Sequence, residues 1–156
     1  MIPPKLKRGD EIRIISPARS LAIISQEVRD NALIVLKNLG LTVTYSKNVS
    51  EKDEFDSSTI KSRVEDIHAA FSDKKVKGIL PTIGGFNSNQ LLKYLDYNLI
   101  KSNPKILCGY SDITALQNAI YTKTGLVTYS GPAFSTWGMQ RGLDYTLEYF
   151  KKCLME

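Results

Sequence analysis

The stretch Lys105-Ile106-Leu107-Cys108-Gly109-Tyr110-Ser111-Asp112-Ile113-Thr114 joins a short apolar run to a segment with helical spacing of apolar residues. This order predicts a strand, a tight turn and a helix, with Ser111 at the apex of the turn. A serine in this position presents its hydroxyl beside the unpaired N–H groups at the start of the helix. Serine hydrolases use this geometry, but Ser-Asp is also an ordinary pair at the beginning of a helix. The turn by itself therefore leaves two interpretations open, a nucleophile and a plain helix cap.

The composition is that of a globular protein with one domain. The chain has 156 residues, of which 42% are hydrophobic and 24% are charged, so it has enough apolar surface for one core. It contains no run of 18 apolar residues, so we expect no membrane span and no membrane partner. Its first residues lack an apolar segment after the basic ones, so we expect no signal peptide.

The charged residues and the cysteines indicate neither a nucleic-acid partner nor a metal. The net charge is +5, from 21 basic and 16 acidic residues, but the basic residues are scattered among acids and form no dense cluster. Cys108 lies in an apolar run, where we expect a small buried hydrophobic residue, and Cys153 lies too far away for metal-ligand spacing. We therefore expect no nucleic acid, no metal and no other cofactor. Two such cysteines are typical of a reducing cytoplasm.

Strand patterns alternate with helix patterns along the rest of the chain. Strands are expected at 10–15, 41–45, 76–83, 106–108 and 127–130, and helices from Ser25 to Gly40, from Ser57 to about Lys75, around Leu91, Leu92 and Leu95, from Ser111 to about Thr124, and from Leu143 to Leu154. Short connections between strands and helices imply right-handed crossovers and parallel strands. The predicted fold class is therefore α/β: an open, mostly parallel, flavodoxin-like sheet with helices on both faces.

Three turns follow predicted strands and are expected at one edge of this sheet, where ligands bind in such folds. They are Ser16-Pro17, Gly84-Gly85-Phe86-Asn87 and Gly109-Tyr110-Ser111-Asp112. Glycines allow close approach and expose backbone N–H groups, so the glycine turn and the Asp112 amide suit a developing oxyanion. The alternatives are a tight strand-to-helix turn and a phosphate cradle at a helix N-terminus. The sequence is neither a P-loop nor G-x-G-x-x-G.

A proton acceptor for Ser111 is not evident. His68, the one histidine, lies in the middle of a predicted crossover helix, so we interpret it as a surface or packing residue. The Asp112 side chain is more typical of a helix cap than of a base, and a serine nucleophile normally needs a histidine oriented by a carboxylate. The competing hypothesis is a non-catalytic α/β module that binds an anion at Gly84-Gly85.

Several motifs occur together in the order and spacing of one peptidase family. They are Ser16-Pro17-Ala18, the run from Thr82 to Leu92, Leu95-Asp96-Tyr97, Asn103-Pro104-Lys105, the run from Gly109 to Leu116, and the run from Thr124 to Ala133. Through them the chain resembles, over essentially its whole length, the LD-carboxypeptidase and microcin C immunity family of serine peptidases. Ile113 stands where the elbow G-x-S-x-G has its second glycine, as is normal in this family.

The resemblance implies a Ser-His-Glu peptidase in which Ser111 is the nucleophile and the amides of Gly85 and Asp112 form the oxyanion hole. It also implies that the histidine and the glutamate belong to a second, C-terminal domain. Residues 1–156 are then the N-terminal, nucleophile-bearing domain, which we expect to be inactive alone. The sequence is compatible with a homodimer.

The glycine turn also indicates a branch of the family. Gly-Gly-Phe-Asn is more similar to the microcin immunity branch, whose members cleave the amide of aminoacyl- or peptidyl-nucleotides, than to muropeptide LD-carboxypeptidases, which remain the alternative. We expect Phe86 and Asn87 to line the pocket for such a small peptide or aminoacyl-nucleotide. Trp137 is a candidate platform for a nucleobase, but we prefer packing against the second domain.

Overall fold

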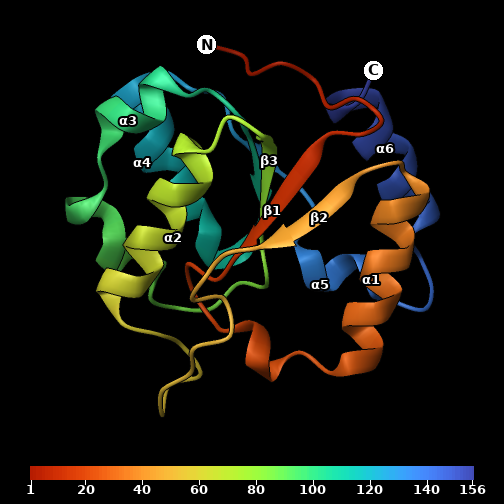
Figure 1. The fold of residues 1–156 in the computed structure, drawn as a ribbon, viewed down its shortest axis with the longest axis horizontal. Helices are drawn as coiled ribbons and strands as arrows, with labels where there is room; N and C mark the ends of the chain where they lie inside the picture. Colours follow the sequence, from red (N-terminus) through yellow and green to blue (C-terminus); the bar gives the residue numbers. More distant parts are fainter.

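The computed structural model describes residues 1–156 and is built on a five-stranded sheet with the order β2-β1-β3-β4-β5 (Figure 1). Every neighbouring pair of strands is parallel. The strands are β1 (Glu11–Ile15), β2 (Thr42–Tyr45), β3 (Val76–Pro81), β4 (Ile106–Gly109) and β5 (Tyr129–Ser130). This order and direction confirm the predicted flavodoxin-like α/β sheet.

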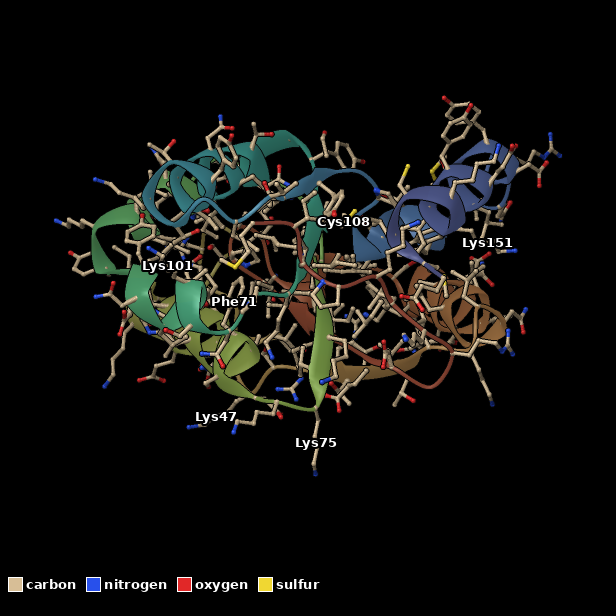
Figure 2. All side chains as sticks on the ribbon, turned by 90° about the horizontal axis from the view of Figure 1, so that it is seen from above. Lys47, Phe71, Lys75, Lys101, Cys108 and Lys151 are labelled. Atoms are coloured by element: carbon tan, nitrogen blue, oxygen red, sulfur yellow. The ribbon has the colours of Figure 1, made fainter.

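Helices cover both faces of the sheet (Figure 1). One face carries α1 (Gln26–Asn38), α5 (Phe134–Trp137) and α6 (Asp144–Leu154), and the other carries α2 (Ile60–Ser72), α3 (Tyr97–Ser102) and α4 (Thr114–Thr124). Figure 2 shows the strands running between these two layers. Ser25 and Thr59 each accept an N–H from the first turn of the helix that follows. Helix α1 therefore begins after the predicted Ser25, whereas α2 begins at Ile60, slightly later than the predicted start at Ser57.

Each face has its own hydrophobic core because successive residues of a strand point to opposite sides. In β4, Ile106 and Cys108 pack against the layer of α1, α5 and α6, whereas Leu107 packs against α2, α3 and α4. Cys108 is fully buried, and burial raises the pKa of its thiol to about 12. The thiol is therefore neutral and packs as the small hydrophobic residue that the sequence predicts.

The segment after the glycine turn differs from the single predicted helix. It forms a 3₁₀ helix, η2 (Ser88–Tyr94), and then the separate helix α3. The chain becomes extended at Leu95, and the Asp96 side chain accepts the Leu99 N–H at 2.9 Å, which starts α3 in a new direction. Two short elements, η1 (Leu21–Ile23) and α5, were not predicted, since three or four residues are too few to show a period.

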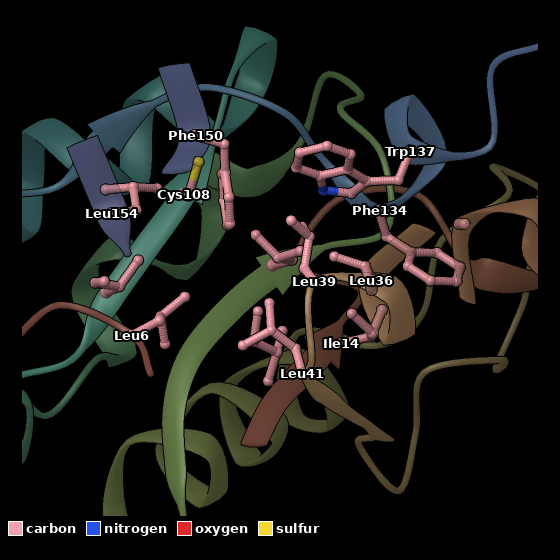
Figure 3. Packing of buried hydrophobic residues seen from close by; sticks show 14 of the residues in the cluster. Leu6, Ile14, Leu36, Leu39, Leu41, Cys108, Phe134, Trp137, Phe150 and Leu154 are labelled. Carbon is pink, nitrogen blue, oxygen red and sulfur yellow. The ribbon is translucent and has the colours of Figure 1, made fainter. Parts of the chain in front are cut away.

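Trp137 lies in the core, and both of the roles predicted for it are wrong (Figure 3). Its ring packs edge-to-face against Phe150 of α6, with centroids 5.0 Å apart. The backbone of the next residue, Gly138, approaches α1 so closely that a Cβ there would lie 2.2 Å from the Val28 carbonyl oxygen. Trp137 is therefore buried between α1 and α6. No face of its ring is exposed to a nucleobase or to a second domain.

Replacing Trp137 tests this placement. We expect Trp137→Ala to lower the free energy of unfolding by about 3–5 kcal/mol, because it leaves a large cavity. Trp137→Phe should cost less, since the indole Nε1 has no hydrogen-bond partner to lose. Urea denaturation followed by circular dichroism measures both, with the exposed Phe55→Ala as a control that should stay within about 0.5 kcal/mol. A Trp137→Ala variant as stable as this control would contradict the buried position.

Helix α2 buries two ionisable side chains, Arg63 and Asp66. The Asp66 carboxylate accepts the Asn48 backbone N–H at 3.1 Å and the Asn48 side-chain amide at 3.0 Å. These bonds fasten the loop after β2 to the helix. Burial, which outweighs these hydrogen bonds, raises the pKa of Asp66 to about 6.

The raised pKa of Asp66 predicts a pH dependence of stability. Between about pH 4 and pH 6 the folded protein holds a proton that the unfolded chain has released, so the free energy of unfolding should fall as pH rises through this window. The fall should be at most about 3 kcal/mol. Asp66→Asn should remove it, whereas Glu65→Gln, at the exposed neighbouring position, should keep most of it, because the charge of Glu65 is the smallest of the causes that raise the pKa of Asp66. Urea titrations at pH 4 and pH 7 check this, and an unchanged difference in Asp66→Asn would refute it.

Candidate functional site

The loops after β1, β3 and β4 meet at one edge of the sheet because these strands are adjacent and parallel. The chain order reverses between β1 and β3, and such a switch point is the usual ligand-binding position in open α/β sheets. The loop after β1 contains Ser16-Pro17, the loop after β3 contains Gly84-Gly85, and the loop after β4 contains Ser111. The predicted convergence of the three turns is therefore confirmed.

Ser111 occupies a strained position at the apex of its turn. Its φ is 63°, in the left-handed region that residues other than glycine rarely adopt. Tyr110 before it is extended, and Ser111 begins a 3₁₀ turn, η3 (Ser111–Ile113), that leads directly into α4. The residue is exposed. An exposed serine with positive φ between a strand and a helix has the geometry of a nucleophile elbow, and such strain is concentrated at functional sites.

Gly84 lies directly against the Ser111 side chain. A Cβ on Gly84 would be 2.9 Å from both the Cβ and the Oγ of Ser111, and 3.6 Å from the Asp112 amide nitrogen. Any larger residue at position 84 would displace the serine. Glycine is therefore required here by the space that the serine takes up.

Asp112 links the serine turn to the glycine turn. Its Oδ2 accepts the backbone N–H groups of Asn87 at 3.0 Å and Ser88 at 2.9 Å, and its carbonyl oxygen accepts the Ser88 hydroxyl at 2.8 Å. Asp112 was predicted to cap the helix that follows Ser111, but it caps a different helix. The carboxylate instead satisfies the first N–H groups of η2, since Asn87 provides no side-chain cap of its own. The two turns are thereby held as one unit.

The glycine turn presents unpaired donors. Neither the Gly84 nor the Gly85 N–H donates a hydrogen bond within the chain. A Cβ on Gly85 would lie 3.0 Å from the Ala18 Cβ and the Arg19 Cγ, so the turn rests against the loop after β1. The backbone of Gly85 therefore packs against the loop after β1 on one side, and its N–H is free to donate to a ligand.

Phe86 and Asn87 lie beside a pocket of about 340 Å³ that also includes Asp53 and Arg63 in its lining. Phe86 is 63% exposed and is available for contact with a ligand. Asn87 is buried, and its side-chain amide donates to the Ser57 hydroxyl at 3.1 Å. A substrate-binding role for both residues stays a prediction, and Asn87 is in addition a framework residue of the turn.

His68 has a structural role, as its sequence position indicates. Its Nε2 accepts the Asp96 N–H at 2.8 Å, at the point where α3 begins. Burial lowers the pKa of His68, so the neutral imidazole that this bond requires is favoured. No group of three or more histidine, cysteine, aspartate or glutamate residues is placed to hold a metal ion. None of the helices combines the length and the apolar character needed to cross a membrane.

Sequence reasoning missed Arg63 and Ser88, which both hold the glycine turn. Arg63 carried a detectable signal, because it lies on the apolar stripe of its helix, three residues after Ile60 and four before Ile67. A charged residue in such a stripe is rarely buried without a partner. Ser88 gave no comparable signal, since a serine at the start of a helical segment is ordinary.

Comparison with known proteins gives close relatives. YocD of Bacillus subtilis (strain 168), which is named as a candidate carboxypeptidase, is 65% identical over 153 residues, covering 98% of this chain and 47% of that protein. The microcin C7 self-immunity protein MccF of Escherichia coli is 36% identical over 156 residues, covering 99% of this chain and 45% of MccF. The chain therefore spans about half the length of these curated relatives.

Solved structures agree with these relatives. The crystal structure of an MccF-like protein from Bacillus anthracis has a TM-score of 0.99 and 63% identity, covering 100% of this chain and 47% of that one. A structure of MccF in complex with aspartyl sulfamoyl adenosine has a TM-score of 0.94 and 36% identity, with the same coverage.

The family model described as the LD-carboxypeptidase N-terminal domain matches residues 12–131. This range includes all three turns at the edge of the sheet. The chain therefore belongs to the S66 family of peptidases, in which it corresponds to the LD-carboxypeptidase N-terminal domain.

Proposed function

We propose that the full-length protein is a serine peptidase in which Ser111 is the nucleophile and the N–H groups of Gly85 and Asp112 form the oxyanion hole. The observation that carries this proposal is the strained, exposed Ser111 lying over Gly84 at the ligand-binding edge. The unpaired N–H of Gly85 supports the second part. Membership of a peptidase family agrees with both.

The reaction follows from this arrangement. The Ser111 Oγ attacks the carbonyl carbon of the substrate amide and gives its proton to a base, and the carbonyl oxygen becomes an oxyanion that accepts the two N–H groups. Collapse releases the amine with the transferred proton, and water then hydrolyses the acyl-enzyme. Because His68 is engaged by Asp96, we assign the base and its orienting carboxylate to a histidine and a glutamate of a second domain. Residues 1–156 alone should therefore be inactive.

For the substrate we propose an aminoacyl- or peptidyl-nucleotide, cleaved at the amide of the aminoacyl part. The Gly-Gly-Phe-Asn turn supports this class, as does the relation to MccF, whose structure contains aspartyl sulfamoyl adenosine. The second candidate is a muropeptide, which the LD-carboxypeptidase description of the family favours. We place the activity in the cytoplasm, in line with the two cysteines, which form no disulfide.

Ser111→Ala tests the nucleophile. In the full-length protein we expect this change to abolish hydrolysis of aspartyl sulfamoyl adenosine and labelling by a fluorophosphonate probe, because it removes the hydroxyl that forms the acyl-enzyme. Chromatographic detection of released aspartate measures turnover, and Ser135→Ala is the control with an intact nucleophile. Retained turnover in Ser111→Ala would refute the peptidase mechanism and favour the anion-binding module.

The same assay separates the two substrate classes. A muropeptide with a terminal D-amino acid is compared with aspartyl sulfamoyl adenosine at equal concentrations, using the unmodified full-length protein. Higher kcat/KM for the muropeptide would overturn the aminoacyl-nucleotide assignment and leave the role of Ser111 intact.

Gly84→Ala tests the space beside the nucleophile. The added methyl group would lie 2.9 Å from the Ser111 Oγ, so we expect the serine to move and kcat to fall by about 100-fold. Asn89→Ala, at an exposed position in the neighbouring η2, is the matched control. Fluorophosphonate labelling rates and kcat are measured for both. Wild-type rates in Gly84→Ala would show that the serine does not depend on this contact.

A further inference from the structure

We propose that Arg63 is a positioning residue for the oxyanion hole, an inference that rests on the proposed peptidase function. Arg63 lies on α2 and is 3% exposed. It borders the pocket beside Phe86, but both of its Nη atoms donate to groups of the chain itself. Its Nη1 donates to the carbonyl oxygens of Pro17 at 3.2 Å and Asn87 at 3.1 Å, and its Nη2 donates to the Gln90 Oε1 at 2.8 Å. One guanidinium thus joins the loop after β1 to the turn after β3.

The charge of Arg63 is costly at this place. Burial lowers its pKa, yet a guanidinium stays protonated in proteins, and no carboxylate lies within ion-pair distance of it. Asp53 and Asp112 offer only longer-range attraction. An apolar residue on this stripe of α2 would avoid the desolvation cost. An apolar side chain has no hydrogen-bond donors, whereas the planar guanidinium donates to two loops at the same time.

The two loops joined by Arg63 are those that hold Gly85. On one side, Asn87 is clamped: its N–H donates to Asp112 and its carbonyl oxygen accepts from Arg63. On the other side, Pro17 immediately precedes Ala18, whose Cβ lies 3.0 Å from the position of a Cβ on Gly85. Arg63 therefore sets the spacing between the glycine turn and the loop that supports it.

This spacing determines where the Gly85 N–H points. Asp112 fixes the turn relative to Ser111, and Arg63 fixes it relative to the loop after β1. Without Arg63 the turn keeps its hydrogen bonds to Asp112, but its link to the loop after β1 is reduced to the one that runs from the Asn87 side chain through the Ser57 hydroxyl to the Ala18 carbonyl oxygen. The Gly85 donor can then shift while Ser111 stays in place. Loss of one oxyanion donor costs about 10²–10³ in kcat, and a misplacement of about 1 Å costs up to about 10².

The test compares Arg63→Met and Arg63→Lys with Arg29→Met in the full-length protein. Arg29 is the matched control, since it also ties a helix to the loop after β1, donating to the carbonyl oxygens of Ile24 at 2.8 Å and Leu21 at 2.7 Å. The readouts are kcat and KM for aspartyl sulfamoyl adenosine, the Ki of an aspartate-derived boronic acid, and the melting temperature. The boronic acid forms a tetrahedral adduct with the serine and so reports on the oxyanion hole.

We expect Arg63→Met to lower kcat by about 10- to 100-fold, to leave KM within about threefold, and to raise the boronic acid Ki by the same factor as it lowers kcat/KM. Arg63→Lys should lose less, because an ammonium can still donate to one of the carbonyl groups. Arg29→Met should leave kcat within about twofold. The melting temperature of this variant should fall, because the loss of hydrogen bonds lowers stability whether or not they lie near the active site.

Three results would overturn the positioning role. They are an unchanged kcat in Arg63→Met, a reduced kcat with an unchanged Ki, and equal kcat losses in Arg63→Met and Arg29→Met. If the Arg63 variants do not fold, Gln90→Ala decides, because Gln90 is an exposed partner of the guanidinium and its loss should lower kcat and raise Ki together, by about threefold. Failure of the proposed peptidase function is distinct, since turnover would then persist in Ser111→Ala.

Discussion

The hydrogen bonds from the Asn87 and Ser88 N–H groups to the Asp112 carboxylate connect the two turns of the candidate site. Without them, the hydrogen bond from the Ser88 hydroxyl to the Asp112 carbonyl oxygen would remain between the glycine turn and the serine turn. With them, the residue after the proposed nucleophile determines where the glycine donors lie. The absence of a side chain at Gly84 then follows from how closely the two turns approach.

The layers around the sheet support this edge in different ways. Helix α2 contributes the buried polar residues, with Arg63 reaching the loops after β1 and β3 and Asp66 reaching the loop after β2. The opposite layer contributes apolar packing, with Trp137 sealed between α1 and α6. Loops are usually the mobile part of an α/β protein. In this protein, buried hydrogen bonds from α2 hold the loops after β1, β2 and β3 in place.

Much of the architecture was predictable because it depends on local patterns. Caps at Ser25 and Thr59 and the apolar runs of β1, β3 and β4 predict their elements directly. The break between η2 and α3 was not predictable, because the leucine spacing continues across it and only the Asp96 cap marks the change. Trp137 was misinterpreted since its surroundings come from α1 and α6, which are distant in sequence.

The sequence by itself determined the fold class and the convergence of three turns at one sheet edge, and it pointed to the serine and the glycine pair as candidate site residues. These depend on periodicity and on the chemistry of single residues, which are local properties. The tertiary structure decided which atoms meet: Asp112 with the glycine turn instead of its own helix, and Arg63 with two loops at once. The physical reason is that a buried polar group must find its partner among whatever residues the fold brings near, and the partners of Asp112 and Arg63 lie 24 residues or more away along the chain.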